Sequence, residues 1–201
     1  MCYNICGEFE TFLTERYQDK KYREKTKLKE RKMNKNTKKG VAYLTRGAMI
    51  AACYVALTYL AHLFGLANGT IQFRISEALC ILPVFLSEAV PGLFAGCLIS
   101  NMITSFNPAD VVFGAIATLI GAVGARLLRN LPTKLLWLAT IPTVVANMLI
   151  VPPVLIFAFG AEEAYLWLVF TVGVGELVCA AIGGTLLGYA LKRARIDTLY
   201  Q

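Results

Sequence analysis

Apolar residues fill one long stretch of the chain and are sparse in the first 40 residues. Between residues 47 and 191, only ten side chains are charged. A water-soluble domain needs a charged outer surface, and so few charges cannot supply one over that length. We therefore expect residues 41–192 to form a membrane domain that is solvated by lipid.

Glycine, proline and charged residues divide this domain into six apolar segments. Backbone polar groups inside a bilayer must be satisfied within the protein, so we expect an all-α integral membrane fold with six transmembrane helices. The second and third segments are short for the roughly 20 residues that a span needs, which predicts that they are tilted or enter only part of the bilayer. The segments are 45–64, 77–88, 91–104, 108–128, 135–157 and 164–191.

Polar sequence flanks the membrane domain on both sides. Residues 1–40 form a basic extension that we expect to be disordered or loosely helical, and residues 193–201 form a short tail. No apolar core precedes a cleavage-like site, so the extension does not resemble a signal peptide. Met33 would be a natural start, and residues 1–32 are not expected to contribute to folding.

The placement of basic residues predicts the orientation. With six spans, the two termini and the loop after the fourth span share one side, and that side holds Arg126, Arg129 and Lys134. On the other side, Arg74 is the only basic residue. The positive-inside rule then places both termini in the cytoplasm of a multi-pass plasma-membrane protein. Because the positive charge lies in a tail and at membrane edges, it does not indicate nucleic-acid binding.

Several kinds of site are missing from the sequence. The six cysteines form no Cys-x-x-Cys pair and His62 is the single histidine, so we expect no disulfide framework, metal site or cofactor. No phosphate-binding loop is present, so the chain is not expected to hydrolyse ATP itself. No catalytic triad or zinc-protease motif is present either, and we expect no enzyme.

Three charged residues remain without a simple structural explanation. Arg74 and Glu77 stand about one helical turn apart in the loop 65–76 and at the mouth of the second segment, where an Asn-Gly pair also predicts a hairpin. An interfacial ion pair between them is the alternative to a ligand role. Glu176 lies within the last apolar segment among small residues, and an ionisable group there is a functional candidate by default, although it could also reach water at the outer interface.

Other polar residues have simpler explanations. Asn101 and Asn147 could form interhelical hydrogen bonds. Asn107, Pro108 and Asp110 together are typical of a helix start. Glu88 ends the second segment, where we expect it to be solvated.

The first span carries small residues at every fourth position, Ala48, Ala52 and Ala56. Such a stripe lets another helix approach closely. It predicts either a docking face for a separate protein or internal packing, and the pattern alone does not decide between them.

Four motifs follow one another along the membrane domain: Phe73-Arg74-Ile75-Ser76-Glu77-Ala78-Leu79, Pro91-Gly92-Leu93-Phe94-x-Gly96-Cys97-Leu98-Ile99-x-Asn101, Asp110-x-x-Phe113-Gly114-x-x-Ala117-Thr118-Leu119 and Gly173-x-Gly175-Glu176. In this order they resemble the QueT family, the substrate-binding (S) components of energy-coupling factor (ECF) transporters for queuosine precursors. The resemblance covers roughly residues 41–192. It implies a six-helix S-component bundle with a ligand pocket toward the outer face.

The resemblance also implies partners. They are an ECF transmembrane coupling protein and two ATPase subunits, for which the Ala48/Ala52/Ala56 stripe would be the docking motif. The ligand would be a 7-deazaguanine base, possibly with an aminomethyl group.

The residue chemistry suits such a ligand. A guanine-like edge presents parallel N–H donors that a carboxylate accepts in a forked geometry, so Glu77 and Glu176 are both candidates. Asn101, Asn147 and Arg74 could complete the edge and carbonyl contacts, and Phe73 or Trp167 could stack on the base. The alternatives are a standalone secondary transporter of a purine-like or vitamin-like solute and, after it, a membrane scaffold.

Overall fold

The computed structural model describes residues 33, 37–66 and 73–194 of the chain. The chain divides into two compact units, Met1–Tyr43 and Leu44–Gln201, and the second unit contains the membrane domain. The described part of this unit is built from helices and contains no strand. The predicted hairpin falls largely on residues 67–72, which lie outside the described residues; beside them, the Phe73 amide donates to the Leu66 carbonyl at 3.0 Å.

Six apolar helical segments are present in the described residues, as predicted. Four of them are long and apolar enough to cross a membrane: Thr37–Leu63, Pro108–Leu127, Thr133–Phe159 and Tyr165–Arg193. The other two are shorter, η1 at Ile75–Val84 and α2 at Ala89–Thr104. The second and third segments are therefore too short to cross a bilayer as straight helices, as their length in the sequence predicts.

Two of the long segments change helical type along their length. The 3₁₀ helix η2 (Thr133–Thr140) runs into α4 (Ile141–Phe159). The last segment consists of α5 (Tyr165–Glu176), the π-helix η3 (Leu177–Gly183) and α6 (Gly184–Arg193). η1 is also a 3₁₀ helix, and Pro83 within it cannot donate a backbone hydrogen bond.

Local sequence explains where α3 (Pro108–Leu127) begins and where α4 ends. The Asn107 side chain accepts a hydrogen bond from the Ala109 amide at 3.0 Å and Pro108 takes the first helical position, so the predicted helix start is confirmed. Gly160 ends α4 in the left-handed region with φ 68°, a conformation that glycine adopts without steric cost.

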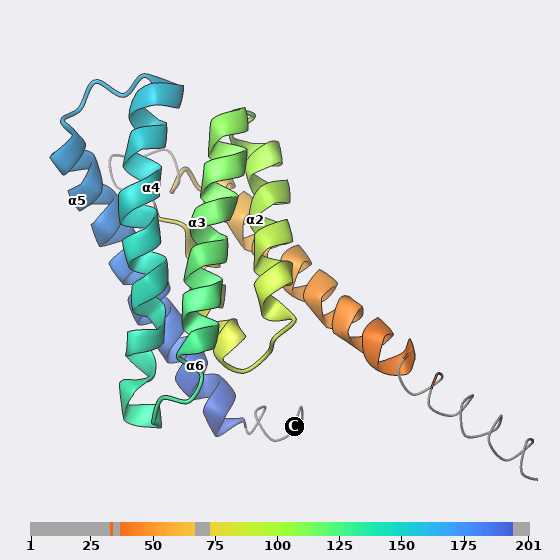
Figure 1. Cartoon of the computed structure of the whole chain (residues 1–201). Helices are drawn as coiled ribbons and strands as arrows, with labels where there is room; N and C mark the ends of the chain where they lie inside the picture. Colours follow the sequence, from red (N-terminus) through yellow and green to blue (C-terminus); the bar gives the residue numbers. More distant parts are fainter. Residues whose placement is uncertain (1–32, 34–36, 67–72, 195–201) are drawn as a thin grey trace, which may run out of the picture. The chain divides into compact units, whose positions relative to one another are not determined.

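α3 lies between α2 and α4, and α4 also packs against α5 (Figure 1). η1 contacts α3, η3 and α6, so the short segment is enclosed by the longer ones. The main cluster of buried apolar residues joins the first helix, η1, α2 and α3; its members are Ile50, Tyr54, Cys80, Ala89, Leu93, Cys97, Ala115 and Ala122.

The first helix and α2 meet through glycines. A Cβ added at Gly92 would lie 2.6 Å from the Gly47 carbonyl oxygen, and one at Gly96 would lie 3.0 Å from the Ala51 carbonyl oxygen. We call this contact the glycine seam. The opposite face of the first helix carries Ala48, Ala52 and Ala56, all of them exposed. The alanine stripe therefore does not serve internal packing in this chain.

An ion pair closes one end of the glycine seam. Arg46 Nη1 lies 3.1 Å from Glu88 Oε1, and the Ser87 hydroxyl donates to the same carboxylate. The expectation that Glu88 is solvated is therefore wrong: it is 5% exposed. Burial alone would raise the pKa of Glu88, but hydrogen bonds from the backbone, Arg46 and Ser87 outweigh it and hold the pKa below its usual value.

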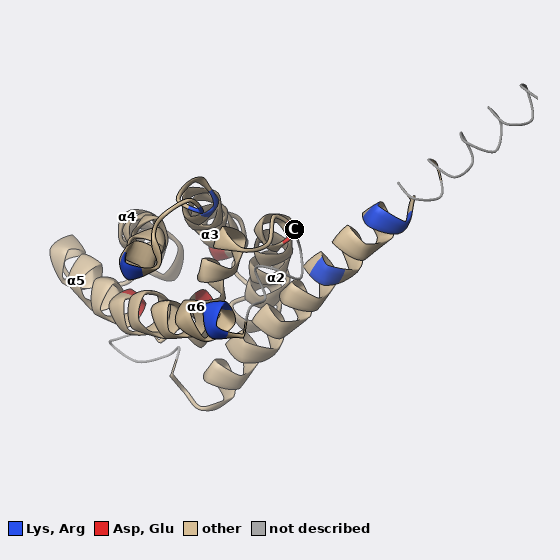
Figure 2. Cartoon of the chain, turned by 90° about the horizontal axis from the view of Figure 1, so that it is seen from below, with Lys and Arg blue, Asp and Glu red and all other residues tan. Residues whose placement is uncertain are grey.

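Basic residues gather at one end of the helices in the second unit (Figure 2). Arg126 lies in the last turn of α3, Lys134 in η2, and Lys192 and Arg193 in the last turn of α6. Two hydrogen bonds tie this end together, from Arg126 to the Pro83 carbonyl and from Lys192 to the Thr133 hydroxyl.

Candidate functional site

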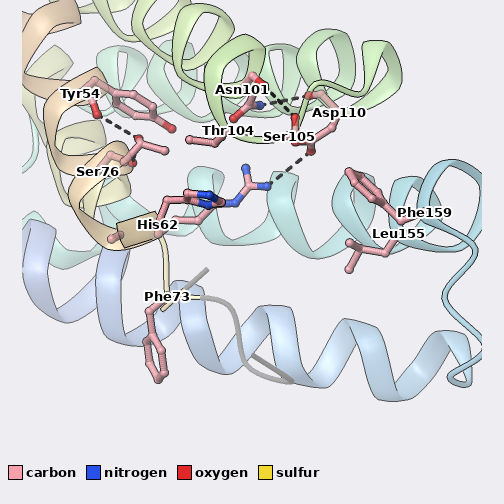
Figure 3. A pocket seen from close by; sticks show the side chains of 13 residues that line it. Tyr54, His62, Phe73, Ser76, Asn101, Thr104, Ser105, Asp110, Leu155 and Phe159 are labelled. Carbon is pink, nitrogen blue, oxygen red and sulfur yellow. Dashed lines mark hydrogen bonds and ion pairs between the residues drawn. The ribbon is translucent and has the colours of Figure 1, made fainter. Parts of the chain in front are cut away.

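A cavity of about 400 Å³ opens between the first helix, η1, α2, α3 and the end of α4 (Figure 3). Its volume falls within the roughly 300–1,000 Å³ typical of small-molecule sites. Its walls are mostly polar toward α2 and α3 and apolar toward α4. The lining residues are Tyr54, Thr58, Ala61, His62, Phe73, Arg74, Ser76, Asn101, Thr104, Ser105, Asp110, Leu155 and Phe159.

An ion pair forms the charged wall of the cavity. Arg74 Nη2 lies 3.5 Å from Asp110 Oδ1, and the two side chains are 17% and 9% exposed. Burial of the guanidinium would lower its pKa, but the Asp110 carboxylate outweighs that effect and raises it, so Arg74 stays charged. The described ion partner of Arg74 is thus Asp110, which sequence reasoning had treated only as part of a helix start.

Asn101 and Gly114 complete this wall. The Asn101 amide donates to the Asp110 carbonyl at 3.1 Å, which joins α2 to the first turn of α3. A Cβ at Gly114 would lie 2.6 Å from Asn101 Nδ2 and 3.8 Å from Arg74 Nη1. The absence of a side chain at position 114 therefore makes room for the Asn101 amide.

Glu77 follows Ser76, which lines the cavity, and is fully buried. Its carboxylate accepts hydrogen bonds from the Tyr54 hydroxyl at 2.5 Å, the Thr118 hydroxyl at 3.3 Å and the Cys80 thiol at 3.0 Å. These donors come from the first helix, α3 and η1. Glu77 thus joins three elements at the core of the bundle.

A second polar group lies on α4 and α5 and includes Glu176 and Asn147. Asn147 is 0% exposed, and neither of its amide atoms has a hydrogen-bond partner among the described residues. The Thr143 hydroxyl, one turn before it, and Glu176 Oε2 are likewise buried without a partner. Glu176 lies beside Asn147.

The two aromatic candidates differ in position. Phe73 lies at the edge of the cavity, with its ring turned away from Asn101 and Asp110 (Figure 3). Trp167 is 49% exposed, stacks on Phe170 with 5.7 Å between ring centroids, and is not among the residues that line this cavity.

Sequence reasoning missed several residues of the site. Tyr54 and Thr58 lie on the inner face of the first helix, where Thr58 also donates to the Ser76 hydroxyl at 2.8 Å. Their four-residue spacing on the face opposite the alanine stripe could have identified them. Thr118 and Asp110 gave no comparable signal, because their partners lie 41 and 36 positions away in the chain.

Comparison with known proteins agrees with the resemblance. The QueT transporter family matches residues 44–193. The chain is 29% identical over 157 residues to the queuosine precursor transporter QueT of Lactococcus lactis subsp. cremoris (strain MG1363), covering 75% of this chain and 92% of that protein. No solved structure matches the chain significantly. Since the family match spans most of the chain and nearly all of the described helices, the chain belongs to the QueT transporter family.

Proposed function

We propose that this chain is the substrate-binding S component of an ATP-driven ECF importer and that its ligand is a queuosine precursor, a 7-deazaguanine base. Family membership and the name of the matched Lactococcus protein support the substrate class. The observation that carries the proposal is the cavity walled by Arg74, Asp110 and Asn101 inside a bundle of apolar helices. Charged and amide groups at such a depth are costly unless they serve a function.

The ligand enters from the outer face in this proposal. The basic end of the helices supports a cytoplasmic position for the termini by the positive-inside rule. The cavity lies near the start of α3, whereas Arg126 lies in its last turn. The cavity would then open away from the cytoplasm.

The ligand is tested by identification and by binding. The chain is purified in detergent, the small molecule that it retains is identified by mass spectrometry, and the affinity for 7-deazaguanine with and without an aminomethyl group is measured by calorimetry. We expect a retained deazapurine and saturable binding. Recovery of a vitamin, or no binding of either base, would contradict the proposed substrate.

Docking to the ATPase-containing partners is proposed for the exposed face of the first helix, at Ala48, Ala52 and Ala56. An Ala52→Trp variant should bind ligand as the parent does and should fail to copurify with ATPase subunits, because a bulky side chain prevents close helix approach. Leu149→Trp, a matched change at an exposed position of α4, should copurify normally. If the parent chain transports ligand without ATPase subunits, it is a standalone secondary transporter.

A further inference from the structure

The polar group on α4 and α5 differs from the rest of the buried polar residues. Four of its atoms have no hydrogen-bond partner in the part of the chain that the structure describes: the Thr143 hydroxyl, both amide atoms of Asn147 and Oε2 of Glu176. The side chains that carry them are between 0% and 4% exposed. Buried polar groups in native proteins are nearly always paired, and the cost of leaving one unpaired is highest where no water is near.

Glu77 provides the internal comparison. It is buried as deeply as Asn147, but its carboxylate accepts hydrogen bonds from a tyrosine, a threonine and a cysteine of three different elements. Both of its oxygens therefore already have donors within the protein. Glu77 is suited to holding helices together, whereas Glu176 retains an unused acceptor.

The backbone holds the unpaired atoms close together. Thr143 and Asn147 are four residues apart on α4 and so lie on one face of it. Thr143 packs against α3, because a Cβ at Gly121 would lie 2.5 Å from its hydroxyl. A Cβ at Gly173 would lie 2.9 Å from the Met148 side chain, so α5 lies tightly against α4 one turn before Glu176.

Glu176 stands at a break in helical geometry. It is the last residue of α5, and the π-helix η3 begins at the next residue. π-helical segments are rare and occur frequently at functional sites. The π-helix η3 that follows Glu176 packs against η1, whose N-cap residue Arg74 lines the cavity.

We propose that Glu176 and Asn147 form the subsite that binds the hydrogen-bonding edge of the ligand, a planar heterocycle with adjacent N–H donors beside a carbonyl oxygen. Glu176 Oε2 accepts from the N–H donors, and the Asn147 amide donates to the carbonyl oxygen. This inference rests on the proposed function and decides which of the two glutamates contacts the base. Glu77 acts as a positioning residue that fixes Tyr54 and η1.

The experiment compares two probes that differ in one group. 7-Deazaguanine has an exocyclic amine next to its ring N–H, and 7-deazahypoxanthine lacks that amine. The parent should bind 7-deazaguanine more tightly by on the order of 10–100-fold, because 7-deazahypoxanthine leaves a buried acceptor without a partner. Glu176→Gln should weaken 7-deazaguanine binding by a similar factor and bring the ratio between the two probes close to one.

Two further variants separate the subsite from a general effect on folding. Asn147→Ala should weaken both probes to the same extent, because both carry the carbonyl oxygen. Glu163→Gln, the same change at an exposed position before α5, should leave both affinities unchanged. Thermal unfolding in detergent shows whether each variant is folded. If Glu176→Gln does not fold, the affinities of Asn147→Ala for the two probes test the subsite instead.

The outcomes distinguish the two levels of the proposal. If the parent binds 7-deazaguanine and Glu176→Gln keeps both the affinity and the probe ratio, the subsite assignment is wrong and the proposed function stands. If the parent binds neither probe, the proposed substrate is wrong, and the subsite assignment fails with it.

Discussion

Two arginine–carboxylate pairs lie in different surroundings within the same bundle. Arg46 and Glu88 meet at 3.1 Å beside the glycine seam, where the backbones of the first helix and α2 touch. Arg74 and Asp110 meet at 3.5 Å beside the cavity, where polar side chains face an open volume. The arginine of the first pair is 40% exposed and that of the second 17%.

The difference shows that an ion pair in a membrane protein does not by itself mark a binding site. At the glycine seam, the two helix backbones touch, and the Arg46–Glu88 pair links the first helix to the start of α2. At the cavity, Gly114 and Asn101 leave space next to the pair, so its charge is available to a ligand. The packing around a charge decides its role more than the charge does.

Asp110→Ala should have the largest effect on stability. It leaves the Arg74 charge buried without its partner, and breaking a buried pair costs about 3–5 kcal/mol. Thermal unfolding in detergent should show the loss. The double variant Arg74→Ala/Asp110→Ala should be more stable than Asp110→Ala alone, because it leaves no unpaired charge; strictly additive losses would contradict the buried-pair account.

Gly92→Ala should destabilise the protein by about 1–3 kcal/mol at the glycine seam, the usual cost of overpacking. The new methyl group would lie 2.6 Å from the Gly47 carbonyl oxygen, a backbone atom that cannot move away cheaply. The control is Gly40→Ala on the first helix, where a Cβ would meet nothing within 4 Å. Equal melting temperatures for the two variants would show that the glycine seam is not tight.

Arg46→Ala should cost about 1 kcal/mol or less, because a half-exposed arginine is screened by solvent. The Ser87 hydroxyl still donates to Glu88 in this variant. The measurement is the same thermal unfolding, and ligand affinity should not change. A loss as large as that of Asp110→Ala would remove the contrast between the two pairs.

Acid should weaken the Arg46–Glu88 pair in a specific direction. The pKa of Glu88 is lowered in the folded state, so its contribution to stability is complete above the unfolded value near 4.5 and is lost as the pH falls through the folded value. The difference in melting temperature between the parent and Glu88→Gln should therefore shrink as the pH falls from 7 to 3. A constant difference would mean that the carboxylate charge contributes nothing.

Much of the fold could be predicted from the sequence because lipid imposes strict limits on composition and on hydrogen bonding. The six apolar segments, the helix start at Asn107 and the shortness of η1 and α2 all follow from local patterns. The 3₁₀ and π geometries do not, because they depend on how neighbouring helices pack.

The candidate site was harder to predict. Arg74, Glu176 and Asn147 stood out because charge and amide groups are rare in apolar segments. Asp110 was assigned to a helix start, which is correct but incomplete, since its side chain also pairs with Arg74 across 36 positions. The helix-start motif explains Asp110 on its own, so its second role as the partner of Arg74 becomes visible only in the packed structure.

Gly114 offers a way to separate recognition from assembly. A single added methyl group there would press on Asn101 and approach Arg74, and none of its nearest neighbours is one of the exposed alanines of the first helix. A Gly114→Ala chain is therefore expected to keep the exposed alanine face and to lose ligand binding. In the importer proposed above, such a subunit would occupy the ATPase partners without delivering ligand and so compete with the intact protein.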